Sequence, residues 1–367
     1  MTVIDAVNDK GKLMHEMIDR LYLENNLSKE ELAWLIDNID EEHKELLFDY
    51  AVKTRRRYYG DKVYMRGLIE FSNICKQNCL YCGLRASNKK VERYRLSKEE
   101  ILECCIEGYK LGYRTFVLQS GEDPWYTVER LVDIIQSIKE MFNDVAITLS
   151  IGERSYEEYQ RMFKAGANRF LLRHETASRH LYEKLHPGMS FDNRRDCLRT
   201  LKEIGYQVGA GFMVGLPGQT AMDLAEDLCY LKELHPDMIG IGPFIPHSET
   251  PLKNEKGGTV EQTLVMLALT RLLIPDSLMP ATTAMGTLHK RGRELALKAG
   301  ANVVMPNLSP VSVRAKYEIY EGKICTGDDA VHCRHCIEQR IRSVGYEVDM
   351  GRGDSYRFVK GQVSTCV

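Results

Sequence analysis

The 367-residue sequence has no apolar run of the length that a membrane span requires. It also lacks an excess of charge of one sign, because 50 Lys and Arg face 52 Asp and Glu, a formal net charge of −2. A general attraction to nucleic acid or to an anionic membrane is therefore not expected. The first 20 residues contain acidic side chains and no apolar core segment, unlike a secretory signal peptide. We expect a cytoplasmic protein that binds neither nucleic acid nor membrane.

Internal repeats and low-complexity linkers are absent too, so we expect no domain boundary within the central part of the chain. Apolar residues make up 44% of the sequence and charged residues 28%, as in ordinary globular proteins. A chain of this length can bury a barrel-sized core. The 11 cysteines, without a secretion signal, favour a reducing compartment and metal binding over disulfides.

From residue 63 onward, short apolar segments alternate with helical ones, which is typical of a parallel α/β fold. Strands are expected at 63–71, 114–119, 145–150, 168–174, 207–214, 237–242, 279–283 and 302–306. Helices are expected near 97–111, 127–141, 155–165, 193–204, 219–234, 258–274 and 289–299. This alternation predicts a (β/α)8 TIM-type barrel, and a doubly wound sheet is the structural alternative.

The sequence before and after this alternation differs from it. Residues 1–60 are expected to form an N-terminal helical extension, in which Ser28 is a candidate N-cap with Glu31 three residues further on. The barrel is expected over 61–320, and a tail that contains cysteines over 321–367.

Two expected strands carry charged side chains on one face and apolar side chains on the other. The charged set is Arg66 and Glu70 in the first strand and Arg169, Arg173 and Glu175 in the fourth. Buried charges without partners are costly, so we expect the barrel interior to be a polar cavity that binds a ligand. Mutual pairing of these arginines and glutamates is the alternative.

Cys75, Cys79 and Cys82 follow the first expected strand with the spacing C-x3-C-x2-C. The polar residues between them, and Gly83 after them, suit a loop that wraps around a small inorganic site. Iron–sulfur clusters are usually held by four Cys thiolates. Three local ligands therefore predict a 4Fe-4S cluster with one iron left open, just as catalytic metal sites keep an open position. A zinc site or three unrelated buried cysteines are the alternatives, although the second Cys pair of a zinc site is not nearby.

Three further cysteines, Cys325, Cys333 and Cys336, have the spacing C-x7-C-x2-C in the tail and predict a second metal site. Zinc, or a site that holds no metal, is the alternative. The remaining five cysteines have no motif around them. Buried apolar side chains are expected for Cys104, Cys105, Cys197 and Cys229, and disorder is expected for Cys366.

The C-x3-C-x2-C motif, with an aromatic residue (Tyr81) before its third cysteine, resembles the signature of the radical SAM superfamily. In that superfamily S-adenosylmethionine chelates the open iron, and one electron from the cluster cleaves it to methionine and a 5′-deoxyadenosyl radical. From about residue 64 to the tail the chain also resembles the HydE family of FeFe-hydrogenase maturases. This resemblance is carried by IEFSNICKQNCLYCGLR, VLQSGEDPWY, FLLRHETA, GAGFMVGLPGQT, IGIGPFIPHSETPL, PATTAMGT and NVVMPN.

The resemblance implies roles for three groups of residues. The cysteines of the first motif would ligate the 4Fe-4S cluster. The S-adenosylmethionine site would consist of Gln119, Ser120, Thr148, Glu175, Arg194, Met238, Met305 and Tyr317. Glu175 would hold its ribose end and Arg194 its carboxylate end. A deeper anion-binding cavity, where the substrate would react, would consist of Arg66, Arg169, Arg173, Thr282, Thr283 and Tyr320.

The resemblance also implies a substrate and partners. The substrate would be a cysteine-bound iron carbonyl cyanide species made by HydG, which the adenosyl radical would attack at the cysteine sulfur. The scaffold GTPase HydF would act downstream, and an electron donor is needed. The tail cysteines would hold a second cluster, 2Fe-2S or 4Fe-4S, which the activity of the family does not require. Fixed guanidinium groups in the cavity agree with an anionic substrate.

Two other functions stay open. The first is another barrel radical SAM enzyme, of the biotin synthase or the methylornithine synthase type. A biotin synthase-like sulfur inserter would need cluster ligands inside the barrel, whereas Cys197 and Cys229 fall in expected helices. The second is a non-catalytic iron–sulfur carrier, which would need no charged interior and would not cleave S-adenosylmethionine.

Overall fold

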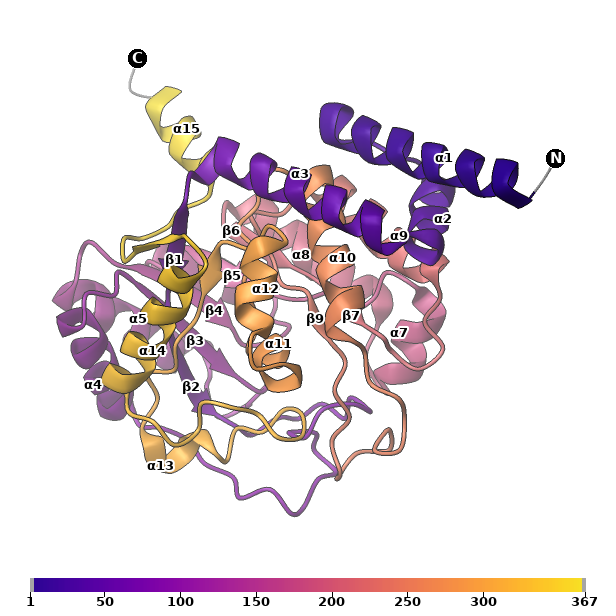
Figure 1. Ribbon diagram of the computed structural model, residues 1–367. Helices are drawn as coiled ribbons and strands as arrows, with labels where there is room; N and C mark the ends of the chain where they lie inside the picture. Colours follow the sequence, from indigo (N-terminus) through magenta and orange to yellow (C-terminus); the bar gives the residue numbers. More distant parts are fainter. Residues whose placement is uncertain (1–2, 365–367) are drawn as a thin grey trace.

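A computed structural model describes residues 3–364 and shows a barrel of parallel strands surrounded by helices (Figure 1). Three N-terminal helices and α15 lie at one end of the barrel, and long loops cover the opposite end. Within residues 3–364 no helix combines the length and the apolar character needed to cross a bilayer. Cys366 lies outside the described residues.

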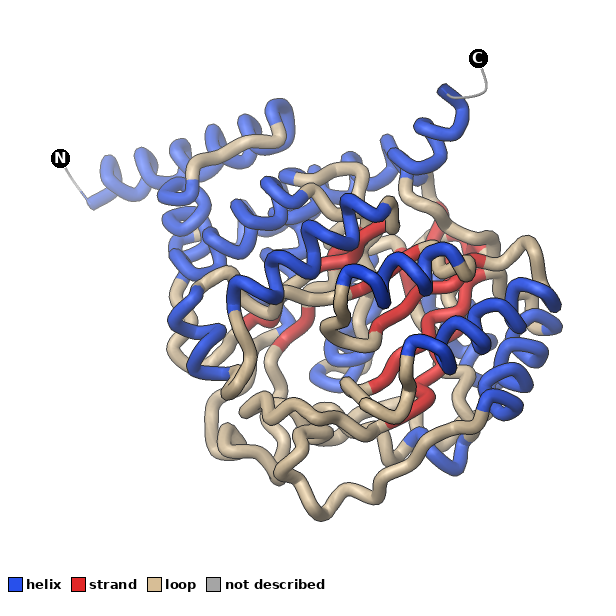
Figure 2. The backbone as a smooth tube through the Cα atoms, turned by 180° about the vertical axis from the view of Figure 1, so that it is seen from behind, coloured by secondary structure: helices blue, strands red, loops and turns tan. Residues whose placement is uncertain are grey.

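The barrel wall is a six-stranded parallel sheet that two shorter strand groups complete. The six strands, in spatial order, are β2 (Gly67–Ser72), β3 (Thr115–Ser120), β4 (Ala146–Ser150), β5 (Arg169–Leu171), β6 (Gln207–Ala210) and β8 (Met238–Ile239). The shorter groups are β10 (Val303–Val304), β1 (Lys62–Met65) and β11 (Glu347–Asp349), and β7 (Met213–Val214) with β9 (Gly242–Pro243). Figure 2 shows these strands as the central layer.

Single parallel bridges between residues close the barrel between β8, β10 and β2. Met238 pairs with Leu278, Pro280 with Val303, and Leu68 with Asn307. The predicted (β/α)8 barrel is therefore confirmed, and the doubly wound alternative is wrong. The strand expected at 279–283 is reduced to bridges, because Pro280 has no N–H to donate to a ladder.

Helices cover the outside of the barrel, where apolar faces of strands and helices meet (Figure 2). Between β2 and β10 they are α4 (Lys98–Lys110), α5 (Val128–Met141), α6 (Tyr156–Lys164), α7 (Arg179–Leu185), α8 (Phe191–Ile204), α9 (Ala221–Leu234), α10 (Val260–Leu273), α11 (Thr283–Leu288) and α12 (Gly292–Lys298). Several begin with a capping box, such as that of Ser97 and Glu100 before α4. The predicted helix at 289–299 is shorter than expected, and α7 was not predicted.

The N-terminal extension consists of α1 (Val3–Glu24), α2 (Lys29–Asn38) and α3 (Glu41–Tyr59). The predicted capping box is confirmed: Ser28 accepts from the Glu31 N–H, and the Glu31 carboxylate accepts from the Ser28 N–H. Helix α2 packs on α9, and α3 packs on α10. The extension is thereby joined to the outer helices of the barrel.

The tail is more ordered than its sequence indicated. It contains α14 (Ala330–Ser343) and α15 (Tyr356–Ser364), and α13 (Val311–Arg314) lies just before it; none of the three was predicted. Strand β11 pairs in parallel with β1 through Lys62 and Glu347, so the tail also adds a strand beside the barrel. The segment after β11 crosses the end of the barrel where the strands begin.

Candidate active site

The cysteine loop follows β2 at the carboxyl ends of the strands, where TIM-type barrels carry their active sites. Sequence reasoning missed the residue that fixes this loop, which is Arg93. Its guanidinium donates to four backbone carbonyls, those of Asn73, Leu84, Arg85 and Asn88, at 2.5–3.1 Å. Because these carbonyls come from both arms of the loop, Arg93 holds the loop in place without any metal.

The loop also touches the end of β3 closely. A Cβ atom at Gly121 would lie 2.3 Å from the Ile74 carbonyl oxygen and 2.7 Å from the Cys75 Cβ. The backbone N–H of Glu122 points at the Cys75 sulfur over 3.4 Å. Only glycine permits this approach at position 121, and it places a backbone donor beside one of the thiols.

All three thiols of the first motif lie half-buried in this loop. Burial raises the pKa of the Cys75, Cys79 and Cys82 thiols, that of Cys82 to about 12. The neutral thiols are thus favoured in the protein alone. Binding of positively charged iron would favour the thiolates, because metal ligation releases the thiol protons. In the part of the chain that the structure describes, no three Cys, His, Asp or Glu side chains converge on one metal ion. Three thiols from one loop are the donor type that iron–sulfur clusters use.

Tyr81, the aromatic residue of the motif, is fixed by a buried histidine. Its hydroxyl lies 2.9 Å from Nε2 of His186, whose Nδ1 lies 2.8 Å from the carbonyl oxygen of Tyr182. Since a carbonyl only accepts, Nδ1 carries the proton and Nε2 accepts from the Tyr81 hydroxyl. Burial lowers the pKa of His186 to about 3, which keeps the ring neutral. Met189 of the same turn places its sulfur 4.0 Å from that of Cys79.

Arg173 and Glu175 lie beyond the end of β5 and form an ion pair with an Nη2–Oε2 distance of 3.0 Å. Arg194 of α8 donates to the Glu153 carboxylate and to the Arg173 carbonyl, both at 2.6 Å. Glu175 lies close enough to Cys82 to add to the effect of burial on its pKa. The structure thus brings three predicted residues, Arg173, Glu175 and Arg194, to the end of the barrel that holds the cysteine loop.

Other residues predicted for S-adenosylmethionine lie along the same interior. Gln119 Nε2 donates to the Tyr317 hydroxyl at 3.3 Å, and the Ser120 hydroxyl donates to the Gly121 carbonyl at 2.7 Å. A further group lines an interior cavity of about 20 Å³: Thr148, Met238 and Met305, together with Arg66. The Thr148 hydroxyl has no hydrogen-bond partner within residues 3–364.

Glu70, the second charged residue of the first strand, is paired inside the barrel. Its carboxylate binds Lys323 Nζ at 2.5 Å and Asn307 Nδ2 at 2.8 Å. Lys323 also donates to the Tyr317 carbonyl at 2.8 Å. For Glu70 the pairing alternative therefore holds, although its partner is a lysine from the tail rather than an arginine.

The threonines of the predicted anion cavity lie at the start of α11. Thr283 and Arg293 line a cavity of about 40 Å³ that reaches the tail cysteines. Arg293 Nη2 donates to the Thr283 hydroxyl at 3.2 Å, whereas Thr282 Oγ1 is buried without a partner in the described chain. Burial raises the pKa of Tyr320 to about 12.

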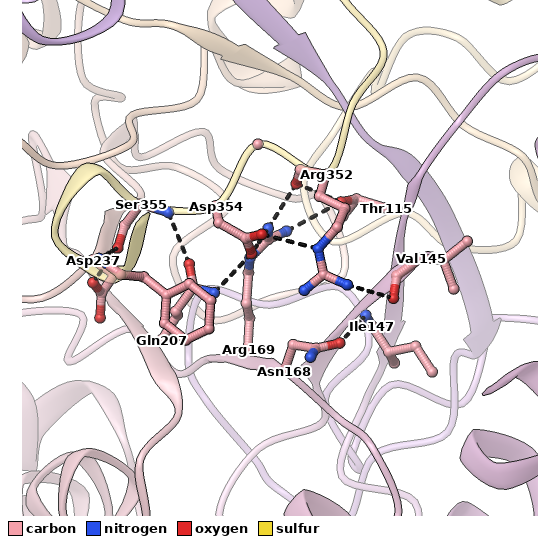
Figure 3. A network of polar contacts seen from close by, with 12 residues as sticks. Thr115, Val145, Ile147, Asn168, Arg169, Gln207, Asp237, Arg352, Asp354 and Ser355 are labelled. Atoms are coloured by element: carbon pink, nitrogen blue, oxygen red, sulfur yellow. Dashed lines mark hydrogen bonds and ion pairs between the residues drawn. The ribbon is translucent and has the colours of Figure 1, made fainter. Parts of the chain in front are cut away.

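Arg169 lies at the opposite end of the barrel and is already engaged. It is the first residue of β5, and its guanidinium donates to Asp354 Oδ1 and the Arg352 carbonyl at 2.6 Å and to Thr115 Oγ1 at 3.1 Å (Figure 3). Arg66 likewise donates to the Gly353 carbonyl at 3.1 Å. The structure does not bring Arg169 together with Arg173, because four strand residues move a side chain by about 13 Å along the barrel.

The tail cysteines come from a loop and from α14. Cys325 receives hydrogen bonds from Arg293 at 3.5 and 3.6 Å, and Arg314 approaches the Cys333 sulfur at 3.7 Å. The hydrogen bond between the two thiols, reinforced by Arg293, lowers the pKa of Cys325. Cys336 is exposed one helical turn after Cys333. The same hydrogen bond, together with burial, raises the pKa of Cys333, so the thiolate form is favoured at Cys325 and not at Cys333.

The fold and this site define a radical SAM enzyme, and comparison with known proteins agrees. The Radical SAM superfamily model matches residues 69–229. The chain is 51% identical over 335 residues to the [FeFe] hydrogenase maturase subunit HydE of Thermotoga maritima, with 91% of this chain and 94% of the relative covered. The chain therefore belongs to the HydE family of the radical SAM superfamily.

Three more distant likenesses are a relative in sequence and two solved structures. The 3-methylornithine synthase of Methanosarcina acetivorans is 34% identical over 301 residues, which cover 80% of this chain and 83% of that protein. A crystal structure of methylornithine synthase (PylB) has a TM-score of 0.80 at 29% identity and covers 91% of this chain and 97% of its own. A structure of the maturase HydG, with a TM-score of 0.80 at 20% identity, shares the fold.

Sequence reasoning missed several residues that shape the site. These residues are Arg93, His186, Lys323 and Arg293. His186 and Lys323 bind partners 105 and 253 residues away, whereas the partners of Arg93 lie within 20 residues and Thr283 lies 10 residues from Arg293. A signal was present for His186, since Leu-His-Pro-Gly interrupts two helices at 185–188. The other three stand among many similar basic residues and carry no local pattern.

Proposed function

We propose that this radical SAM enzyme acts in FeFe-hydrogenase maturation, as its relative from Thermotoga maritima is named to do. A 4Fe-4S cluster held by Cys75, Cys79 and Cys82 would supply the electron for reductive cleavage of S-adenosylmethionine. The observation that carries the proposal is the convergence of these thiols with Glu175 and Arg194 at one end of the barrel.

The residues of the chain have defined tasks in this proposal. Glu175 would accept hydrogen bonds from the ribose hydroxyls, and Arg194 would attract the carboxylate of S-adenosylmethionine. Gln119, Ser120, Thr148, Met238, Met305 and Tyr317 would line the rest of that site. The space beside the cysteine loop is limited by Tyr81, which His186 holds, and by the close approach of the loop at Gly121.

The second substrate would enter the deeper cavity. We expect a cysteine-bound iron carbonyl cyanide species supplied by HydG, with its product passed to HydF in the cytoplasm. Arg173 is the arginine best placed to hold its carboxylate, because 30% of its side chain is exposed and only Glu175 opposes it. The cavity would be completed by Thr282, Thr283, Tyr320 and Arg66. Arg169 would contribute only indirectly, through its ion pair with Asp354 at the end of the barrel where the strands begin.

The tail cysteines would hold a second iron–sulfur cluster, of the 2Fe-2S or the 4Fe-4S type. The support is the environment of Cys325, whose pKa is lowered by the hydrogen bond with Cys333 and by the adjacent Arg293, whereas Cys325 and burial raise the pKa of Cys333. We also propose the division into an extension over 1–60, a barrel over 61–320 and a tail over 321–367, with the tail fastened to the barrel through β11.

The test uses the anaerobically reconstituted chain with a chemical reductant. We expect 5′-deoxyadenosine and methionine in equal amounts, and we expect a maturation mixture of HydF, HydG and apo-hydrogenase to need this chain. The Cys82→Ala variant, purified in parallel, should support neither reaction. Full hydrogenase activation without the chain would contradict the maturation proposal, although S-adenosylmethionine cleavage would still stand.

A methylornithine synthase activity is the second candidate, because both a curated relative and a solved structure of that enzyme match most of the chain. An assay for 3-methylornithine as a product separates the two functions. Formation of 3-methylornithine would favour the mutase, whereas an absence of product, with maturation intact, would favour the HydE-type function.

A further inference from the structure

A buried histidine and a buried aspartate lie just behind the predicted S-adenosylmethionine site and have no part in the proposed chemistry. His174 stands between Arg173 and Glu175 in the chain, but its side chain points to the outer helices. Its Nε2 lies 3.1 Å from Oδ1 of Asp227, a residue of α9. Both side chains are almost fully buried, at 2% and 0% exposure. A buried carboxylate is costly, so its presence in an outer helix requires a reason.

The hydrogen bonds define the state of the histidine. Nδ1 accepts from the backbone N–H of Gly211 at 3.3 Å, so the proton is on Nε2 and is donated to Asp227. Burial is the main cause that lowers the pKa of His174, and the nearby Arg195, Arg173 and Arg194 lower it further. A neutral ring with this one tautomer can serve both partners at once.

Asp227 joins the two ends of the turn that contains Glu175. Its Oδ1 also accepts a hydrogen bond from the Ala177 N–H at 2.5 Å. One carboxylate oxygen therefore accepts hydrogen bonds from residues on both sides of Glu175, His174 and Ala177. Arg195 of α8 donates to the Ala177 carbonyl at 3.3 Å, and the ring of Tyr230 packs against His174 at 4.9 Å between centroids. Burial raises the pKa of Asp227, with the Ala177 N–H acting against the shift.

Glu175 itself has an unusual backbone conformation. Its φ is +66°, a left-handed value that residues with a side chain rarely adopt. Its N–H donates to the Gly211 carbonyl, and its carbonyl accepts from the Met213 N–H, both at 3.0 Å. Gly211 cannot be replaced here, since a Cβ atom would lie 2.0 Å from the Gly240 carbonyl oxygen. The His174 ring and the Glu175 backbone are thus fastened to the same glycine.

We propose that His174 and Asp227 are positioning residues that hold the left-handed Glu175 turn, and so aim the Glu175 carboxylate at S-adenosylmethionine. The inference rests on the proposed role of Glu175 as a ligand of that cofactor. Without the clamp the turn would relax toward an ordinary conformation, because a strained residue persists only where its surroundings hold it. The carboxylate would then turn away from the cysteine loop.

The test measures the dissociation constant of S-adenosylmethionine on the reconstituted protein, with iron content and melting temperature as separate readouts. His174→Phe keeps the ring shape but removes both hydrogen bonds, and we expect at least a tenfold weaker binding with unchanged iron. His174→Gln offers an N–H and a carbonyl and should restore binding to within a few-fold of the wild type. Asp227→Asn, which removes the charge and keeps one acceptor, should lie between the two and replaces His174→Phe if that variant does not fold.

A matched control is Tyr206→Phe. It deletes a buried hydrogen bond of 2.9 Å from the Tyr206 hydroxyl, just before β6, to the carbonyl of Tyr159 in α6. It should lower the melting temperature and leave cofactor binding unchanged. Equal binding by His174→Phe and wild type, or equal weakening by Tyr206→Phe, would overturn the proposal. If Glu175→Gln weakens binding but His174→Phe does not, only the positioning role fails. If the wild type binds no S-adenosylmethionine, the proposed function fails instead.

Discussion

The two ends of the barrel treat their charged and polar side chains differently. At the end where the strands begin, the charges are matched within the chain: Arg169 and Arg352 meet Asp354, which also accepts from Gln207 (Figure 3). At the end where the strands finish, burial raises the pKa of the thiols in the cysteine loop and so favours their neutral form. The Thr282 hydroxyl there has no hydrogen-bond partner among the described residues. The first end pairs Asp354 fully, although Nε of Arg169 and of Arg66 has no hydrogen-bond partner among the described residues. The second end also contains ion pairs, Arg173–Glu175 and Arg194–Glu153, and differs from the first in the thiols of its cysteine loop.

Depth along a strand, rather than residue type, therefore separates structural from functional arginines. Arg169 begins β5 and is buried against Asp354 of the tail, whereas Arg173 lies just beyond the end of β5, where 30% of its side chain is exposed beside Glu175. In TIM-type barrels the carboxyl ends of the strands carry the chemistry, and the other end carries stability. Each of the following changes tests that division.

The largest effect is expected from the cysteine loop. Cys79→Ala leaves two thiols of the motif, which is too few for a cluster that already has one ligand fewer than the usual four Cys thiolates. We expect the cluster to be lost and 5′-deoxyadenosine formation to fall by at least about a hundredfold, roughly 2.7 kcal/mol or more of transition-state free energy. The fold should survive, since Arg93 holds the loop through backbone carbonyls. Iron analysis and product assay check this.

Cys229→Ala is the control for that variant, since Cys229 is a half-buried thiol on α9 outside both motifs. It should retain full iron content and full cleavage activity. Undiminished 5′-deoxyadenosine from Cys79→Ala would remove the basis for placing the cluster in this loop.

At the opposite end, Asp354→Asn should reduce stability without reducing chemistry. The change leaves the fully buried Arg169 without its counter-charge, and breaking a buried ion pair typically costs about 3–5 kcal/mol. Denaturant unfolding should show that loss, while 5′-deoxyadenosine formed per cluster stays unchanged. Asp192→Asn, which disrupts an exposed Arg179–Asp192 pair, is the matched control and should alter stability little.

The same aspartate should also determine part of the acid stability. Burial opposes the charge of Asp354, but Arg169, together with hydrogen bonds from Arg352 and Gln207, outweighs burial and lowers its pKa. A lowered folded pKa stabilises the protein above the unfolded value of about 3.9, and this stability is lost as the pH falls below it. Unfolding free energies between pH 7 and pH 3 should therefore decline less steeply in Asp354→Asn than in the wild type. Parallel slopes would show that Asp354 does not contribute.

Arg173→Lys is expected to have an intermediate effect, on the second substrate only. Lysine keeps the charge but loses the planar fork, and a lost charge-assisted hydrogen bond is worth about 1.5–3 kcal/mol, or roughly ten- to a hundredfold in binding. Hydrogenase maturation should fall by that factor while uncoupled S-adenosylmethionine cleavage continues. Arg169→Lys should instead shift the melting temperature and leave both activities intact. The reverse pattern would assign the substrate to the lower arginine.

Local patterns predicted most of the barrel and the cysteine loop, because strand alternation, capping boxes and ligand spacing are short-range signals. The Ser28 capping box and seven of the eight expected strand positions illustrate this. Parity predicted Arg169 and Arg173 on one face of a longer strand, but parity contains no information on depth, and β5 ends at Leu171. The partner of Arg169 lies 185 residues away, and that of Glu70 lies 253 residues away. Pairings at such separations leave no mark in either neighbourhood of the sequence.

The smallest effect on S-adenosylmethionine cleavage is expected from the tail, although its cysteines touch the barrel. Arg293 links Cys325 to Thr283, so loss of the three tail thiols frees one guanidinium but removes no residue proposed for the cofactor. The triple Ala variant at Cys325, Cys333 and Cys336 should lose the tail iron and keep 5′-deoxyadenosine formation within about twofold. Electron paramagnetic resonance of the remaining cluster provides the check that the first site is intact. Lost cleavage with that signal unchanged would mean that the Arg293–Thr283 contact transmits the state of the tail to the reacting end.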